Sequence, residues 1–313
     1  MTTAEGDRDC IDLDCANKEQ QPTIQRLQAR HSDVGGIPVA RSLPTRGRRL
    51  IGHWCFLDHA GPARFAPDSD GMQVGPHPHT CLQTFTWMIK GKLLHRDSLG
   101  YEQIIRPGQV NLMTAGAGIS HTEASLPGES DLHAAQLWIA LPHEDRHTAP
   151  RFDHYPELPR FEQDGFQATL LMGEQGEHRA PTLSFSPLLG MDLAWPEAAR
   201  TQFSLRPDFE YGILPLEGGI DIEGEHFAEN ELAYLGLGRD RVAIASEQAG
   251  RALLIGGEPM PGRIHMWWNF VGHSREEIEE AQKDWEAGAE RFGHIPRPNR
   301  PRLEAPPIPW KQP

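Results

Sequence analysis

The sequence has few cysteines and no long hydrophobic run. Only four cysteines occur in 313 residues, at irregular spacing, and this excludes the disulfide framework of small secreted proteins. No apolar stretch reaches the ~18 residues that a membrane-spanning helix requires. The N-terminus is polar and acidic and lacks the apolar segment of a signal peptide. We therefore expect a cytoplasmic protein that makes no contact with a membrane.

Positive charge is scarce as well. The chain has 30 Lys and Arg against 44 Asp and Glu, which gives a formal net charge of -14. An acidic chain repels the phosphate backbones of nucleic acids. The most basic run, residues 46–49, is short and fits a solvated loop. We expect no direct binding to nucleic acid.

Helical patterns are rare over most of the chain. Its 31 glycines and 27 prolines separate short apolar runs of strand length, which contain β-branched and aromatic residues. One series lies between residues 24 and 138, and a second follows the charged, proline-rich segment 143–162. Many short strands without intervening helices are typical of sandwiches and barrels. The pattern predicts two all-β units related by a weak internal repeat.

One helix is predicted near the C-terminus. Ser274 suits the N-cap, Glu277 completes a capping box, and Gly293 suits the position after the last turn. An apolar stripe along this segment predicts that the helix packs on a sheet. The expected organisation is a mobile tail (1–22), an N-terminal domain (23–150), a C-terminal domain (151–273), the helix (274–293) and a proline-rich, extended tail (294–313).

Two histidines flank a proline in the segment GPHPHTCLQT, residues 75–84. In a strand, His77 and His79 point to the same face, and Pro78 restricts the backbone between them. His121 and Glu123 repeat this spacing in the later segment GAGISHTEAS. If the two strands are neighbours, three imidazoles and one carboxylate converge on a single divalent metal ion. Such a set leaves metal positions open for water, substrate or dioxygen.

The segments around these residues resemble the pirin family of the cupin superfamily. The similarity is carried by FLDHAGPA (56–63), the block from GPHPHTC to SHTE (75–123), AAQLWIALP (134–142) and the region 269–293. The resemblance implies two stacked jelly-roll β-barrels, of which only the N-terminal one binds metal. It also implies the ligand set His77, His79, His121 and Glu123. Iron, as Fe(II), is the expected metal, with Ni, Mn, Co, Cu and Zn as alternatives.

The sequence departs from the family directly after the histidine pair. Pirins commonly read R-G-F-E there, whereas this chain has Thr80, Cys81, Leu82 and Gln83. Gln83 carries no charge, so Glu123 is the only carboxylate ligand expected. Cys81 continues the alternation from His79 and is either a buried wall residue or a fifth, soft ligand. The C-terminal half offers only His226 at the corresponding place, so we expect no metal there.

Other histidines lie outside this ligand set. HEDRH (143–147) matches a zinc-protease motif, but prolines flank it and no helical periodicity supports it, so we interpret it as coincidence. His59, His95 and His133 either hold the metal ligands in place or are ordinary core or surface histidines. Five apolar residues are candidate pocket walls or plain core: Phe85, Trp87, Met88, Met113 and Trp138.

The resemblance also implies a function. Some bacterial pirins are similar to quercetin 2,3-dioxygenases, in which a flavonol or related aromatic enol binds the metal and reacts with dioxygen, releasing carbon monoxide. In this chain Glu123 would accept the hydroxyl proton. The main alternative is a non-enzymatic regulator that binds a protein partner according to the redox state of its metal. A third is a degenerate cupin that binds a small molecule without chemistry. We favour the dioxygenase.

Overall fold

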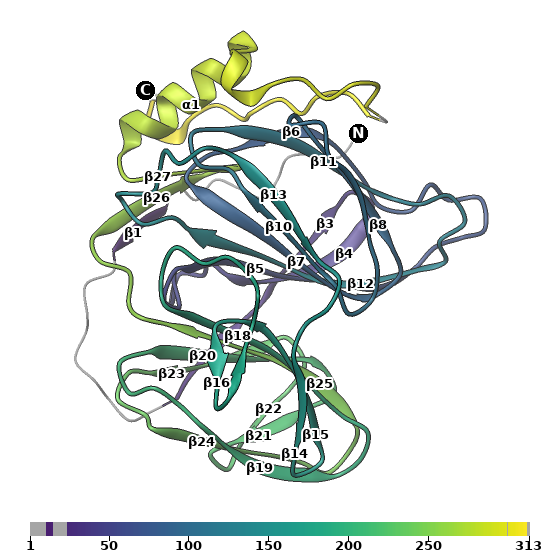
Figure 1. The fold of residues 1–313 in the computed structure, drawn as a ribbon, viewed down its shortest axis with the longest axis vertical. Helices are drawn as coiled ribbons and strands as arrows, with labels where there is room; N and C mark the ends of the chain where they lie inside the picture. The colour runs from purple at the N-terminus through teal and green to yellow at the C-terminus, as the bar shows by residue number, and fades with distance from the viewer. Residues whose placement is uncertain (1–10, 15–23, 299, 312–313) are drawn as a thin grey trace.

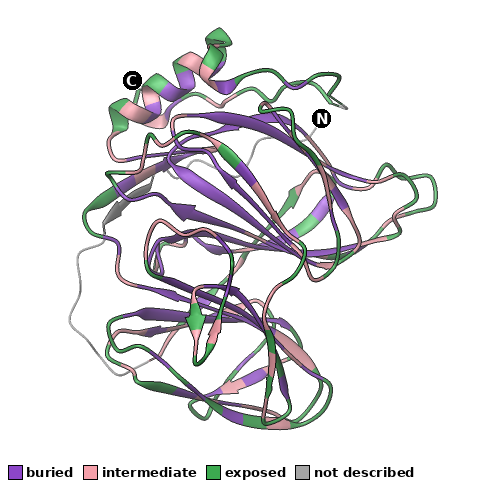
Figure 2. Ribbon diagram, viewed as in Figure 1, coloured by how far each residue is buried: buried purple, intermediate pink, exposed green. Residues whose placement is uncertain are grey.

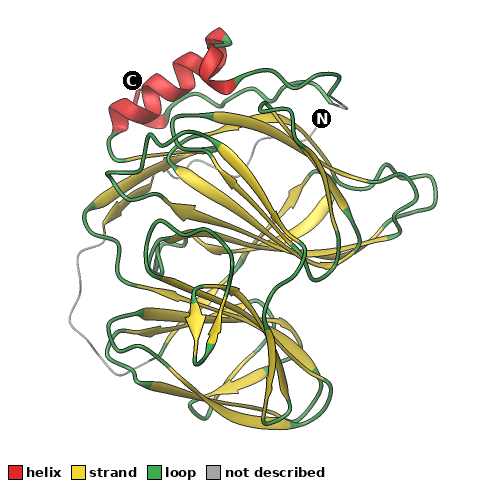
Figure 3. Ribbon diagram, in the orientation of Figure 1, coloured by secondary structure: helices red, strands yellow, loops and turns green. Residues whose placement is uncertain are grey.

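The computed structural model of the chain describes residues 11–14, 24–298 and 300–311. Within these ranges it shows two β-sheet units stacked on each other, with α1 lying across the outer side of the N-terminal unit (Figure 1). Strands make up most of both units (Figure 3). No helix in the described part of the chain is long and apolar enough to cross a membrane.

The N-terminal unit is a sandwich of a seven-stranded and a four-stranded antiparallel sheet. The larger sheet has the order β13-β10-β7-β12-β5-β4-β3, with bounds β3 Arg30–Val34, β4 Ile37–Leu43, β5 Trp54–Arg64, β7 Leu82–Lys90, β10 Val110–Thr114, β12 Asp131–Ala140 and β13 Arg151–Tyr155. The smaller sheet has the order β6-β11-β8-β9, with bounds β6 Gln73–His79, β8 Leu93–Asp97, β9 Glu102–Ile105 and β11 Ile119–Ser125. Met88 of the larger sheet packs with Leu93 and Ile105 of the smaller one, so the two sheets share a core.

The C-terminal unit repeats this arrangement. Its larger sheet has the order β14-β15-β18-β25-β20-β23-β2, with bounds β2 Gln25–Gln28, β14 Arg160–Gln163, β15 Phe166–Met172, β18 Leu188–Trp195, β20 Glu210–Glu217, β23 Glu231–Gly236 and β25 Gly250–Gly257. Its smaller sheet has the order β19-β24-β21-β22, with bounds β19 Ala199–Ser204, β21 Ile220–Ile222, β22 Glu225–Phe227 and β24 Arg241–Ser246. A short hairpin is formed by β16 Glu174–Gln175 and β17 His178–Arg179. The two units therefore have the same layered design, as the weak internal repeat predicts.

Each larger sheet takes one edge strand from the other side of the expected domain boundary. β2 lies before the N-terminal sheets in sequence but pairs with β23 of the C-terminal unit. β13 lies after residue 150 but pairs with β10 of the N-terminal unit. Each of these strands pairs with backbone N–H and C=O groups that a sheet edge would otherwise expose. Pairing, rather than position in the sequence, therefore decides which unit each strand joins. The expected division at residue 150 does not follow the sheets, and the segment 143–162 is more than a linker.

A third sheet brings the start of the chain beside its C-terminal part. It has the order β1-β26-β27, with bounds β1 Ile11–Asp14, β26 Arg263–Trp267 and β27 Phe270–Gly272. The expected mobile tail thus contains one paired strand, while residues 1–10 and 15–22 lie outside the described residues. Thr80 forms a bridge with Phe270, and its hydroxyl donates a hydrogen bond to the Val271 carbonyl oxygen at 3.0 Å. These contacts fasten the third sheet to the end of β6.

The two larger sheets pack face to face through an apolar layer. Phe85 and Trp87 of β7 belong to it, together with Leu214 of β20 and Leu253 of β25. Figure 2 shows these central strands as mostly buried. Phe85 and Trp87 are therefore core residues between the units rather than walls of a pocket. Burial of this layer, at about 25 cal/mol per Å² of apolar surface, favours a fixed stacking of the units.

A chain of polar side chains also joins the units. His59 on β5 and His133 on β12 are buried, and their Nε2 atoms lie 2.7 Å apart. The Nδ1 atom of His59 lies 2.7 Å from Oδ1 of Asn230, and Nδ1 of His133 lies 3.1 Å from a carboxylate oxygen of Glu217. Asn230 and Glu217 belong to the C-terminal unit. These two histidines therefore link the units, a role that the sequence did not reveal.

The helix α1 is shorter than the sequence predicts. It runs over Arg275–Ala287, and the Ser274 side chain accepts a hydrogen bond from the Glu277 backbone N–H, as expected for the N-cap. Gly288 ends it in the left-handed conformation at φ 70°, where glycine has no steric penalty. A separate 3-10 turn, η1 (Glu290–Phe292), follows. The expected apolar stripe is real: Ile278, Ala281 and Trp285 pack with Trp267 and Phe270 of the third sheet.

The C-terminal segment runs back from η1 along the outside of the N-terminal unit (Figure 1). The backbone N–H of Leu303 donates to the Pro76 carbonyl oxygen of β6 at 2.9 Å. Ile308 packs with α1, and the short turn η2 (Pro309–Lys311) follows it. This segment therefore lies against the strand that carries His77.

Candidate metal centre

Three histidines from two adjacent strands gather inside the N-terminal unit. β6 and β11 pair antiparallel with His77 opposite His121 and with His79 opposite Ile119. Directly opposed residues point to the same face, and so do residues two apart. The ligand nitrogens of His77, His79 and His121 lie within 4.8 Å of one another, and all three residues are buried. The predicted adjacency of the two strands is confirmed.

Hydrogen bonds orient two of these rings. The Nδ1 atom of His77 lies 2.9 Å from the Gly75 carbonyl oxygen, and Nδ1 of His79 lies 3.0 Å from that of Asn269. A carbonyl oxygen only accepts hydrogen bonds, so both Nδ1 atoms carry hydrogen and both Nε2 atoms carry a lone pair. Asn269 lies in the turn between β26 and β27. The third sheet therefore helps to fix a residue of the N-terminal unit.

The geometry of the third ring completes the cluster. Nε2 of His121 lies 3.1 Å from Nε2 of His79, while its Nδ1 lies 3.3 Å from Nδ1 of His95. When His121 donates through Nδ1, the lone pairs on the Nε2 atoms of His79 and His121 face each other. Such an arrangement is unfavourable without a cation between the nitrogens. The three imidazoles therefore fit a divalent transition metal, which prefers neutral imidazole nitrogens.

Burial keeps these imidazoles neutral. Burial lowers the pKa of His77 to about 4, against the opposing effect of its hydrogen bond to the Gly75 carbonyl. Burial is also the largest cause that lowers the pKa of His79 and of His121 well below the usual value, and the neighbouring His77 adds to it. At neutral pH each of the three imidazoles is therefore neutral, and one of its ring nitrogens is free to bind a metal.

Glu123 is on the same strand but is held differently. A bulge separates His121 from Glu123 in the pairing with β6, so Glu123 is opposite Val74. Its Oε1 lies 3.5 Å from the Thr86 hydroxyl, and its oxygens do not belong to the set of atoms within 4.8 Å of one another. Part of the residue is exposed, yet burial of the carboxyl raises its pKa against the effects of His95 and Thr86. Its role as a ligand stays a prediction.

Cys81 does not continue the alternation of β6. The strand ends at His79, and Cys81 adopts the left-handed backbone conformation with φ 61°. Its Sγ lies 3.5 Å from the Arg146 carbonyl oxygen and does not belong to the set of ligand atoms within 4.8 Å of one another. Burial raises the pKa of the thiol to about 12. Cys81 therefore fits the buried wall residue rather than a fifth ligand.

Gln83 also lies away from the histidines. Its side-chain amide donates to the Thr114 hydroxyl at 3.0 Å and to the Leu183 carbonyl oxygen at 3.3 Å, between the two units. The HEDRH segment, residues 143–147, forms turns rather than a helix. The interpretation of that motif as coincidence is consistent with this geometry.

Aromatic rings surround the cluster. Trp138 lies edge-on to His79 with centroids 5.0 Å apart, and it stacks on Phe56 at 4.1 Å. Phe152 stacks on His95 at 4.3 Å. Trp138 and Met113, two of the candidate pocket walls, belong to the core beside the cluster. The sequence did not indicate Phe56, Phe152 or the Asn269 carbonyl, because each comes from a segment distant in the chain.

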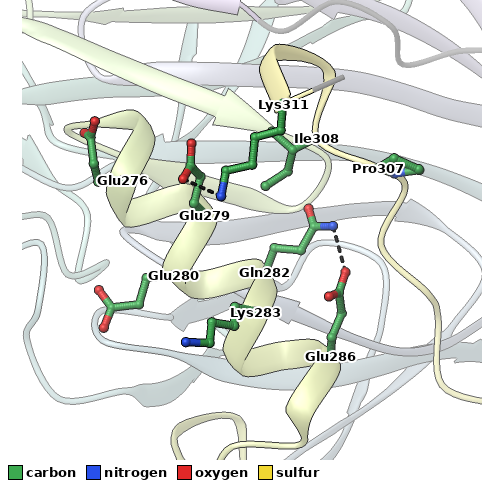
Figure 4. A pocket seen from close by; sticks show the side chains of 9 residues that line it. All are labelled: Glu276, Glu279, Glu280, Gln282, Lys283, Glu286, Pro307, Ile308 and Lys311. Atoms are coloured by element: carbon green, nitrogen blue, oxygen red, sulfur yellow. Dashed lines mark hydrogen bonds and ion pairs between the residues drawn. The ribbon is translucent and has the colours of Figure 1, made fainter. Parts of the chain in front are cut away.

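A surface groove elsewhere in the molecule is unrelated to this cluster. It lies between α1 and the C-terminal segment, and Figure 4 shows Glu279 directed toward Lys311 and Glu286 toward Gln282. Glu279 pairs with Lys311 at 2.6 Å, and Glu286 accepts a hydrogen bond from Gln282 at 2.8 Å. None of the predicted metal ligands lines it.

The stacked pair of β-sandwiches defines a bicupin protein, and within the described residues the first sandwich holds a three-histidine cluster that could bind one metal ion. The chain belongs to the pirin family. Residues 36–139 match the pirin domain, and residues 190–293 match the pirin C-terminal cupin domain. The expected family and fold are therefore confirmed, and the cluster lies in the first of these two domains.

Similar proteins come from several bacteria. A protein of Pseudomonas aeruginosa, whose name assigns it provisionally to the quercetin 2,3-dioxygenases, is 59% identical over 299 residues, which are 95% of this chain and 94% of that protein. The crystal structure of a quercetin 2,3-dioxygenase from Acinetobacter baumannii matches with a TM-score of 0.90 and 47% identity, covering 92% of this chain and 97% of that chain. The pirin YhhW from Escherichia coli, solved with nickel(II), shares the fold with a TM-score of 0.59 and 19% identity, covering 76% of this chain and 100% of that chain.

Proposed function

We propose that the protein is a mononuclear metal dioxygenase of the quercetin 2,3-dioxygenase type. Its substrates would be dioxygen and a flavonol or a similar aromatic enol, and it would act in the cytoplasm. The observation that carries the proposal is the convergence of three buried imidazoles, two of which, His79 and His121, have their Nε2 atoms 3.1 Å apart. The names of the relatives at 59% and 47% identity support the reaction class.

The residues of the cluster have distinct roles in this proposal. His77, His79 and His121 would hold the metal, and Glu123 would be a fourth ligand. Fe(II) remains the expected metal, with Ni, Mn, Co, Cu and Zn as alternatives; nickel is the ion in the YhhW structure. A bound divalent metal would supply a Lewis acid that lowers the pKa of the substrate hydroxyl and a position for dioxygen.

Other groups of this chain would handle the substrate and its proton. The Glu123 carboxyl, whose pKa is raised by burial, is suited to accept the proton of the substrate hydroxyl. Thr86 lies between Glu123 and Gln136, and its hydroxyl donates to Gln136 Oε1 at 2.7 Å. Because its one hydrogen then goes to Gln136, Thr86 would accept a hydrogen bond from Glu123 once that carboxyl has taken up the substrate proton. Trp138 would provide an apolar wall that limits the access of water.

The test is turnover of quercetin by the full-length protein loaded with each candidate metal in turn. We expect loss of flavonol absorbance together with dioxygen uptake and carbon monoxide release. H121A should lose this activity because it removes one imidazole ligand. H31A is the matched control, since His31 is an exposed histidine on β3 of the same unit.

One result would overturn the enzymatic proposal. Protein that holds one metal ion per chain, but consumes neither quercetin nor related enols with any of the six metals, is not a dioxygenase of this type. The regulator that binds a protein partner would then be the better explanation.

A further inference from the structure

We propose that His95 and Asp97 form a positioning pair that selects the metal-binding tautomer of His121. The proposal rests on the metal site of the proposed function but not on its reaction. The pair lies on β8, which flanks β11 on the side opposite β6. Asp97 is opposite His121 in this pairing and His95 is opposite Glu123, so all four residues share one face.

Asp97 is fixed by its own turn. Its Oδ1 accepts hydrogen bonds from the backbone N–H groups of Leu99 at 2.9 Å and Tyr101 at 3.1 Å. Its Oδ2 lies 3.1 Å from Nε2 of His95. An ionised carboxylate only accepts hydrogen bonds, so Nε2 of His95 is the donor. Asp97 is almost fully buried, which limits other orientations of this pair.

The position of the hydrogen on His95 affects the position of the hydrogen on His121. When hydrogen on Nε2 is the only hydrogen on the His95 ring nitrogens, the lone pair lies on Nδ1, which is 3.3 Å from Nδ1 of His121. His121 can then donate through Nδ1, which leaves its lone pair on Nε2, the atom 3.1 Å from Nε2 of His79. The lone pair of His79 competes for the same hydrogen, and the contact with His95 shifts that hydrogen toward Nδ1. Stacking on Phe152, with 13° between the ring planes, holds the His95 ring in this orientation.

The pair distinguishes His121 from the other two histidines. His77 and His79 donate to main-chain carbonyls, whereas His121 donates to an imidazole that is backed by a carboxylate. Hydrogen bonds to such partners raise the basicity of a ligating histidine and fix its ring. His121 should therefore be the strongest donor of the three, and its orientation should depend on replaceable side chains.

The experiment compares two substitutions at one position. In H95N the side-chain oxygen can take the place of Nδ1 and accept the hydrogen bond from His121, whereas H95L has no acceptor. We expect H95L to bind Co(II) ~10–100-fold more weakly than the wild type, the usual effect of losing such a partner, with an altered visible Co(II) spectrum. H95N should stay close to the wild type in both measurements.

H53L is the matched control. His53 is also buried in the N-terminal unit and bonds a carbonyl oxygen, that of Ala140, but it does not contact the cluster. Its Co(II) affinity should equal that of the wild type. A structural effect of removing a buried histidine would lower the affinity of H53L and H95L alike, and equal losses in the two variants would contradict the proposal.

A second readout needs no metal. Nitrogen-15 NMR of the imidazoles in the metal-free protein should show a larger fraction of His121 with hydrogen on Nδ1 in the wild type than in H95L, where only His79 is left to accept it. An equal fraction in the wild type and H95L, or unchanged Co(II) affinity in H95L, would overturn the positioning role. Neither result depends on quercetin turnover, so failure here is distinct from failure of the dioxygenase proposal.

Discussion

The three histidines of the cluster differ from ordinary surface histidines in how readily they take up protons. Burial lowers the pKa of His77 to about 4 and lowers that of His79 and His121 well below the usual value. A lowered pKa leaves the nitrogen unprotonated when the pH falls below 6.5. Metal binding at these nitrogens should therefore continue at a pH where exposed histidines are already protonated.

The lowered pKa of these histidines can be tested by the number of protons that the protein releases when it binds a metal ion at pH 6. Three histidines with the ordinary pKa would together release about two protons, whereas the buried set should release almost none. Glu123 can add at most one proton, because its pKa is raised, and E123Q removes that contribution. Calorimetry of Zn(II) binding to E123Q in buffers of different ionisation enthalpy measures the number. Release of two or more protons would show that the ligands are not these buried imidazoles.

At the scale of single residues, the sequence revealed those features that depend on local alternation. His77 and His79, and later His121 and Glu123, were recognisable because residues two apart in a strand share a face. Cys81 could not be placed in the same way, since its positive φ ends the alternation. Asp97 and the Asn269 carbonyl act across long sequence separations, and no local pattern indicates such contacts.

Among the structural elements, the C-terminal segment contacts the strand that carries His77 and His79. It lies beyond residue 293, where the match to the pirin C-terminal cupin domain ends. Leu303 bonds Pro76 on β6, and an added side chain at Gly75 would meet the Pro301 carbonyl oxygen at 2.3 Å. The segment therefore covers the outer edge of the strand that carries His77 and His79.

Replacing Leu303 tests this contact. L303P removes the N–H that bonds Pro76, whereas L303A keeps it and loses only the side chain. Since one such hydrogen bond contributes about 1 kcal/mol, we expect L303P to raise amide exchange in residues 73–79 roughly fivefold and to speed metal loss. L303A should exchange at the wild-type rate in these residues. Equal exchange in the two variants would show that the segment does not stabilise β6.

The sequence predicts which segments form strands and which forms the helix, but it does not predict which strands pair with each other. Residues 82–90 and 131–140 form strands as their apolar composition indicates. The sequence predicts the end of α1 at Gly293, but Gly288, five residues earlier, already supplies the left-handed cap. The exchange of β2 and β13 between the two larger sheets was not predictable, since edge pairing depends on which backbone groups remain free after folding.

The whole molecule builds the centre from several parts of the chain. β6 and β11 supply the imidazoles, while the turn between β26 and β27 supplies the Asn269 carbonyl that orients His79. The apolar layer and the His59–His133 contact hold the C-terminal unit against the N-terminal one. A fragment limited to residues 23–150 would lack both β13 and Asn269, so the centre is best studied in the full chain.

The most direct test of the account is X-ray absorption spectroscopy of the full-length protein loaded with one equivalent of Zn(II). The account predicts three imidazole nitrogens at about 2.0–2.1 Å from the metal, and two in H121A. A first coordination sphere that contains sulfur, or fewer than three imidazoles in the wild type, would contradict it.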